Sequence, residues 1–142
     1  MKLLIVALLG WIAAHSDHSL PNTQPDVVAM TQIDFELYIC EQMMQCDSPA
    51  PHAEILALFD FDSRTIYVRQ GFDPANREHQ STMVRQLVHF LQALAGRSQI
   101  CRGVLIQEAR QIESYWRVAH NLPPLSPSPL GMLLESCGPG PT

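Results

Sequence analysis

An apolar run between residues 82 and 95 constrains the fold more than any other segment, because it predicts a helix with only one narrow polar stripe. Apolar side chains cover most of the helix circumference at Met83, Val84, Leu87, Val88, Phe90, Leu91, Leu94 and Ala95. The stripe consists of Arg85, Gln86, His89 and Gln92. These four converge on one face, because residues three and four apart are neighbours on a helix. The plain interpretation is an amphipathic helix whose stripe lies in solvent.

The two ends of this helix carry their own signals. Ser81 or Thr82 can cap the start by accepting a backbone N–H, and Gly96 supplies a stop. We therefore expect the helix to span about 82–95.

The surrounding segments predict an α+β fold. Apolar residues at mostly helical spacing predict a helix of about 25–45, with Pro25 near its first turn. Two runs rich in strand-forming residues flank a turn within 55–69 and predict a β-hairpin. A second helix, with apolar residues on its packing side, is expected at about 104–120.

Length and charge limit the number of domains and the kinds of partner. The chain has 142 residues, which suits one domain, and we place it at about 25–122. Residues 123–142 are rich in Pro, Gly and Ser and are expected to be a disordered tail. The formal net charge is -5 and no basic patch is visible. Nucleic acid is thus not an expected partner, because phosphate binding needs clustered Lys and Arg.

The first 16 residues have the pattern of a signal peptide. Lys2 precedes an apolar stretch, which ends in small residues and is followed by a polar segment. The stretch is shorter than the roughly 20 apolar residues of a membrane-spanning helix. We predict a secreted or periplasmic protein without stable membrane insertion after removal of the signal. The alternative is a buried first helix.

Export would favour disulfide bonds. The chain has four cysteines, Cys40, Cys46, Cys101 and Cys137. All four are candidates for bridges, and the sequence leaves their three possible pairings open. None has the Cys-x-x-Cys spacing that indicates a zinc ribbon or a redox site.

The order of these segments resembles a family of small exported bacterial zincin-like proteins, described mainly as a domain of unknown function. The shared order is a hairpin ending in "TIYV", a helix with Leu-Val-His-x-x-Gln, a cysteine-bearing loop and a helix with the acidic "IESYW". The resemblance covers about residues 46–122. In zincins, His-Glu-x-x-His on a helix supplies two zinc ligands and the general base.

The resemblance assigns positions to several residues of this chain. His89 falls on the second histidine and Gln92 on the family's following glutamine, while Glu113 and Tyr115 fall on its Glu-Ala-Tyr segment. Gln111 stands where the family tends to have another acid. The vestigial ligand set implied by the resemblance is His89, Glu113 and Glu108, and the residues lining the site are Arg85, Gln92, Gln111 and Tyr115.

Two departures from the pattern affect the chemistry. Arg85 replaces the first histidine, and a guanidinium remains protonated and cannot be a metal ligand. Gln86 replaces the catalytic glutamate, and an amide cannot accept and return a proton. We expect Arg85 to pair with Glu113 or Glu108 instead.

The expected function is therefore a catalytically inactive pseudo-metallopeptidase, without a cofactor, that binds an unknown protein or peptide or has a structural role. One alternative is an active zinc-dependent hydrolase with an altered ligand set, in which His79 or His120 replaces the missing ligand. The other is a small disulfide-stabilised interaction module unrelated to zincins.

Overall fold

A computed structural model describes residues 1–43 and 55–126, which fold into four helices and a three-stranded sheet. In chain order the elements are α1 (Lys2–His15), β1 (Asp26–Met30), α2 (Gln32–Met43), β2 (Ala57–Asp60), β3 (Thr65–Arg69), α3 (Arg77–Leu94) and α4 (Arg102–Ala119). The expected α+β class is confirmed.

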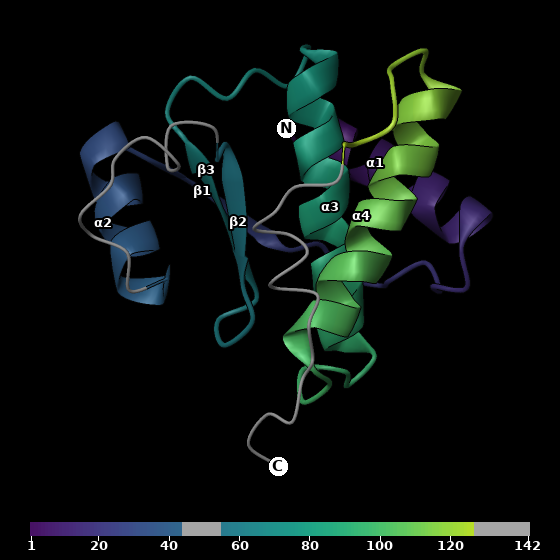
Figure 1. Cartoon of the computed structure of the whole chain (residues 1–142), viewed down its shortest axis with the longest axis horizontal. Helices are drawn as coiled ribbons and strands as arrows, with labels where there is room; N and C mark the ends of the chain where they lie inside the picture. Colours follow the sequence, from purple (N-terminus) through teal and green to yellow (C-terminus); the bar gives the residue numbers. More distant parts are fainter. Residues whose placement is uncertain (44–54, 127–142) are drawn as a thin grey trace.

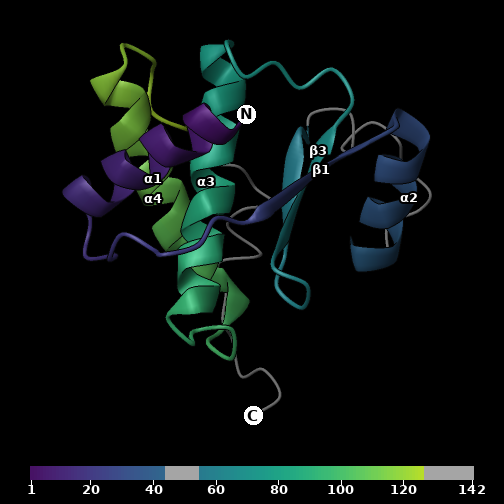
Figure 2. The ribbon, with the colours of Figure 1, turned by 180° about the vertical axis from the view of Figure 1, so that it is seen from behind.

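The sheet has the order β1-β3-β2 and separates two groups of helices. The central strand β3 runs parallel to β1, with Val28 opposite Tyr67, and antiparallel to β2, with Phe59 opposite Ile66. Helix α2 covers one face and α3 the other, while α4 and α1 pack on the side of α3 that faces away from the sheet (Figures 1 and 2).

Helix α3 is therefore the centre of the molecule, with β2, α1 and α4 around it. Its apolar residues form much of the main core cluster. Three members of its polar stripe, Gln86, His89 and Gln92, are also buried. The interpretation of the stripe as a solvent-exposed face is wrong, because neighbouring elements cover nearly the whole circumference of this helix.

The expected single helix of 25–45 is wrong in its first part. Residues 26–30 form the edge strand β1, and α2 begins only at Gln32. Val27 and Val28 are β-branched and favour a strand. The hydroxyl of Thr31 then accepts a hydrogen bond from the Asp34 N–H at 3.2 Å, which satisfies one of the free N–H groups at the start of α2.

The start of α3 also differs from the expectation. Asn76, rather than Ser81 or Thr82, caps the helix, and its side-chain oxygen accepts from the N–H groups of Glu78 and His79 at 2.9 and 3.3 Å. Helix α3 is thus about one turn longer than expected. Its end agrees with the sequence, since Gly96 follows the C-cap with a φ of +74°.

The hairpin and the second helix are confirmed. Strands β2 and β3 pair across a turn in which Asp60 Oδ1 accepts from the N–H groups of Asp62 and Ser63 at 2.9 and 3.3 Å. Helix α4 lies within two residues of the expected 104–120.

The N-terminal helix α1 packs against α3 and buries four apolar side chains, Ile5, Leu8, Leu9 and Ile12. Within the described residues, no helix has both the length and the apolar character needed to cross a membrane. A helix is expected both for a signal peptide and for a buried first helix, so the signal peptide stays a prediction.

Two further predictions fall partly on residues 44–54 and 127–142, which lie outside the described residues. Cys40 is in α2 and Cys101 directly precedes α4, and no described cysteine is a free thiol. Cys46 and Cys137 lie outside, so the pairing stays a prediction. Of the tail, residues 123–126 lie along α4, where the carbonyls of Pro123 and Ser126 accept from Arg117 and Arg110.

Candidate functional site between α3 and α4

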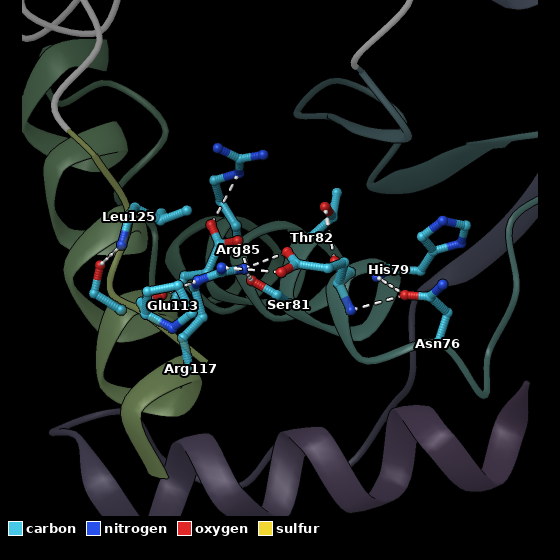
Figure 3. A network of polar contacts seen from close by, with 11 residues as sticks. Asn76, His79, Ser81, Thr82, Arg85, Glu113, Arg117 and Leu125 are labelled. Carbon is cyan, nitrogen blue, oxygen red and sulfur yellow. Dashed lines mark hydrogen bonds and ion pairs between the residues drawn. The ribbon is translucent and has the colours of Figure 1, made fainter. Parts of the chain in front are cut away.

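Arg85 of α3 and Glu113 of α4 form the charged pair at the centre of the site (Figure 3). The distance from Arg85 Nε to Glu113 Oε1 is 3.3 Å, which confirms the expected pairing with a carboxylate of the second helix. Glu113 is only 2% exposed, whereas the Arg85 side chain is 28% exposed. The contact is an ion pair without hydrogen-bond alignment, because Glu113 Oε1 accepts no hydrogen bond.

The other oxygen of Glu113 is held by a polar network that the sequence analysis missed. The Ser81 hydroxyl donates to Glu113 Oε2 at 2.5 Å and accepts from Arg117 Nη1 at 3.1 Å. Arg117 also donates to both carboxylate oxygens of Glu78, at 2.6 and 3.1 Å. The spacing could have indicated this network, since Glu78, Ser81 and Arg85 share one helix face.

Burial and neighbouring charges act in opposite directions on these carboxyl groups. Burial raises the pKa of Glu113 above its ordinary value, and Arg85 and Ser81 counteract only part of this rise. The hydrogen bonds from Arg117 lower the pKa of Glu78, which lies nearer the surface. Glu113 is therefore the carboxylate whose charge depends most on its partners.

Gln86 bonds to the sheet. Its Oε1 accepts from the Phe59 N–H of the edge strand β2 at 2.9 Å, and the side chain is buried. This contact satisfies a backbone donor that would otherwise be buried without a partner. Gln86 thus links helix α3 to strand β2.

His89 is held in one tautomer by Gln92. The Gln92 amide nitrogen donates to Leu105 O at 3.0 Å and to Glu108 Oε1 at 2.9 Å, so the amide oxygen is the acceptor that faces His89. His89 Nδ1 lies 2.8 Å from that oxygen and must carry the proton. The lone pair is then on Nε2, and burial lowers the pKa of His89 to about 4.

Glu108 belongs to this second network and does not pair with Arg85. Besides the contact with Gln92, Arg97 Nη1 donates to both carboxylate oxygens of Glu108 at 3.1 Å. His18 Nε2 lies 3.0 Å from Glu108 Oε1. The three residues expected as a ligand set are therefore divided, with His89 and Glu108 joined through Gln92 and Glu113 held by Arg85. Among the described residues, no group of three His, Cys, Asp or Glu side chains has an arrangement that could hold a metal ion.

The remaining candidates make other contacts. Gln111 donates to the Tyr115 hydroxyl at 2.8 Å, and both residues line a hollow of about 560 Å³ that Glu108, Arg97 and His18 also line. His79 accepts from the Asp73 N–H, and His120 contacts the Trp116 carbonyl at the end of α4. Neither histidine joins His89.

The fold and site define a small α+β domain in which a central helix shares buried polar networks with a neighbouring helix. The chain belongs to the family described as a domain of unknown function, DUF6647, whose profile matches residues 1–126. No curated protein and no solved structure matches the chain.

Proposed function

We propose that this chain is a non-catalytic, zincin-like domain that acts through binding, in which the Arg85–Glu113 ion pair occupies the place of a metal. The observation that carries the proposal is the 3.3 Å contact between Arg85 Nε and the buried carboxylate of Glu113. In a zincin-like arrangement this carboxylate is the candidate third zinc ligand. Here its nearest cation is a guanidinium supplied by the chain itself.

The donor set does not fit a catalytic zinc site. Such a site needs three protein ligands and a position for water. Arg85 cannot coordinate and places positive charge beside Glu113, while Glu108 already has three polar partners. The general base is missing as well, because the amide of Gln86 cannot take a proton from water.

An active zinc hydrolase remains the second candidate function, and one observation favours it. The Nδ1–H of His89 donates to the side-chain oxygen of Gln92, and the lone pair is on Nε2. A metal-binding histidine is commonly held in this way. This supports descent from a metal site as much as present binding.

We also propose that the domain is exported to the periplasm or the medium. The support is the sequence of residues 1–16, with one cation, an apolar stretch and small residues near its end. Its partner would be a protein or peptide outside the cytoplasm.

Metal content and peptidase activity test this function. The protein, purified without chelator and with its disulfides formed, should contain less than one equivalent of zinc and should not cleave an unfolded protein substrate. His89→Ala serves as the matched variant. One equivalent of tightly held zinc that is released by His89→Ala would contradict the proposal and favour the altered hydrolase.

A further inference from the structure

Arg85 stands where the zincin-like pattern has a histidine. The region beside His89 therefore favours an anionic ligand over a metal cation. Only Nε of Arg85 faces Glu113, and the terminal nitrogens of the guanidinium point away from that carboxylate (Figure 3). Within the described residues, neither terminal nitrogen has a hydrogen-bonding partner. Arg85 thus keeps a pair of charged donors on the partly exposed side of α3.

A second cation, Arg102, contacts the aromatic neighbour of His89. The Arg102 guanidinium is 3.8 Å from the centre of the Phe61 ring, and that ring lies edge-on to His89 at 5.5 Å. Arg102 is the first residue of α4, which has no side-chain N-cap. The positive end of the helix dipole therefore adds to its charge, while Asp62 in the hairpin turn offsets part of it.

His89 contributes an unused acceptor near both cations. It is 8% exposed, and its Nδ1–H is bonded to Gln92. Its Nε2 has no hydrogen-bonding partner among the described residues. Burial is the main cause of the lowered pKa of this imidazole, and the charges of Arg85 and Arg102 add to the effect. A bare anion would be repelled by the Nε2 lone pair, whereas a ligand hydroxyl could donate to it.

We infer that Arg85, Arg102 and His89 form a binding site for a small oxyanion that carries a hydroxyl group, such as a 2-hydroxycarboxylate or hydrogen phosphate. The two guanidinium groups would bind the anionic oxygens, and His89 Nε2 would accept from the hydroxyl. Phe61 forms an apolar wall. The inference rests on the proposed binding role and names a ligand class for it. That ligand is an anion, whereas a zinc ion is a cation.

Calorimetric titration of the full chain tests this site with four small probes: glycolate, acetate, inorganic phosphate and ethylene glycol. Glycolate should bind about tenfold more tightly than acetate, because the hydrogen bond from its hydroxyl to His89 Nε2 contributes about 1.4 kcal/mol. Ethylene glycol, which lacks charge, should not bind. Tighter binding of glycolate would indicate a carboxylate ligand, and tighter binding of phosphate a phosphate ligand.

Three variants separate this site from general attraction of anions. Arg102→Gln should weaken glycolate binding by about tenfold, since a charge-assisted contact is lost. His89→Gln should remove the preference for glycolate over acetate. Arg77→Gln, at an exposed position in the first turn of α3, should leave both affinities unchanged.

The inference would be overturned if neither glycolate nor phosphate bound at tens of millimolar. Equal loss of binding in Arg77→Gln and Arg102→Gln would also overturn it. Neither result would bear on whether Arg85 replaces a metal, because that question depends on the zinc content of the protein.

Discussion

At the scale of single residues, Glu113 has the least accessible charge in the site. Its carboxylate is buried, and Arg85 is the cation in direct contact with it. A buried ion pair adds little stability compared with apolar packing, but removal of one partner leaves a costly unpaired charge. The pair therefore constrains which substitutions the site tolerates.

We predict that Arg85→Gln lowers the free energy of unfolding by about 3 kcal/mol, because Glu113 loses its cation. Adding Glu113→Gln should recover part of that loss. Arg77→Gln is the surface control and should change stability by less than about 0.5 kcal/mol. Urea unfolding measures the parent, Arg85→Gln, Glu113→Gln, the double variant and the control Arg77→Gln. Additive effects of the two site changes would show that the pair is not coupled.

A pH effect follows from His89, whose pKa is lowered to about 4 by burial. Between about pH 6.5 and about pH 4 the unfolded chain binds a proton at this residue and the folded chain does not. The stability that the neutral His89 contributes is therefore fully present above about pH 6.5. As the pH falls from about 6.5 to about 4, the free energy of unfolding decreases by about 3 kcal/mol in total. The raised pKa of Glu113 acts with the opposite sign.

The variant His89→Gln isolates this effect. Unfolding free energies at pH 7 and pH 4.5 should differ less for the variant than for the parent. The same pH dependence in both proteins would mean that His89 takes up its proton at the same pH in the folded and unfolded chains, which would contradict the lowered pKa.

At the scale of elements, the sequence predicts a helix or strand correctly where a single local pattern, such as helical periodicity or a cluster of turn residues, dominates the segment. The periodicity of α3 and α4 and the turn residues between β2 and β3 led to the correct elements. Residues 26–30 were misassigned because Val27, Val28 and Met30 fit a helical spacing, and the partner strand that decides the matter, β3, is distant in the sequence. Pairing with a distant strand is not visible in a local pattern.

The cap of α3 provides a test at this scale. Asn76→Ala should lower the free energy of unfolding by about 1 kcal/mol, because two N–H groups lose their acceptor. Thr82→Ala, at the position suggested by the sequence, should cost clearly less, since its hydroxyl only contacts the Glu78 carbonyl at 3.4 Å. The reverse order would contradict the observed start of the helix.

At the scale of the whole molecule, the sequence located the pair of helices but not the division of their polar residues into two networks. The i and i+4 spacing brings Arg85 and His89 together, and the resemblance supplied Glu113 as a partner. That Gln92 joins His89 to Glu108, and that Ser81 and Arg117 hold Glu113, depends on the contact between α3 and α4. The rotation of one helix against the other cannot be inferred from either alone.

Export is tested on the intact cell. If residues 1–16 are a signal peptide, the protein recovered from the periplasm or medium should begin at or close to Asp17. N-terminal sequencing and intact mass measure this directly. A protein that begins at Met1, and loses stability when residues 2–16 are deleted, would show that α1 is a permanent part of the core, in line with its four buried side chains.

The central claim is that the ion pair occupies a former metal site, and zinc titration of the double variant Arg85→His with Gln86→Glu tests it most directly. The variant restores both histidines and the base, and His89 is already held with its lone pair on Nε2. It should bind one zinc ion more tightly than the parent, and Glu113→Gln should abolish the gain more completely than Glu108→Gln. A folded double variant that binds zinc no better than the parent would show that the helix pair lacks zincin geometry.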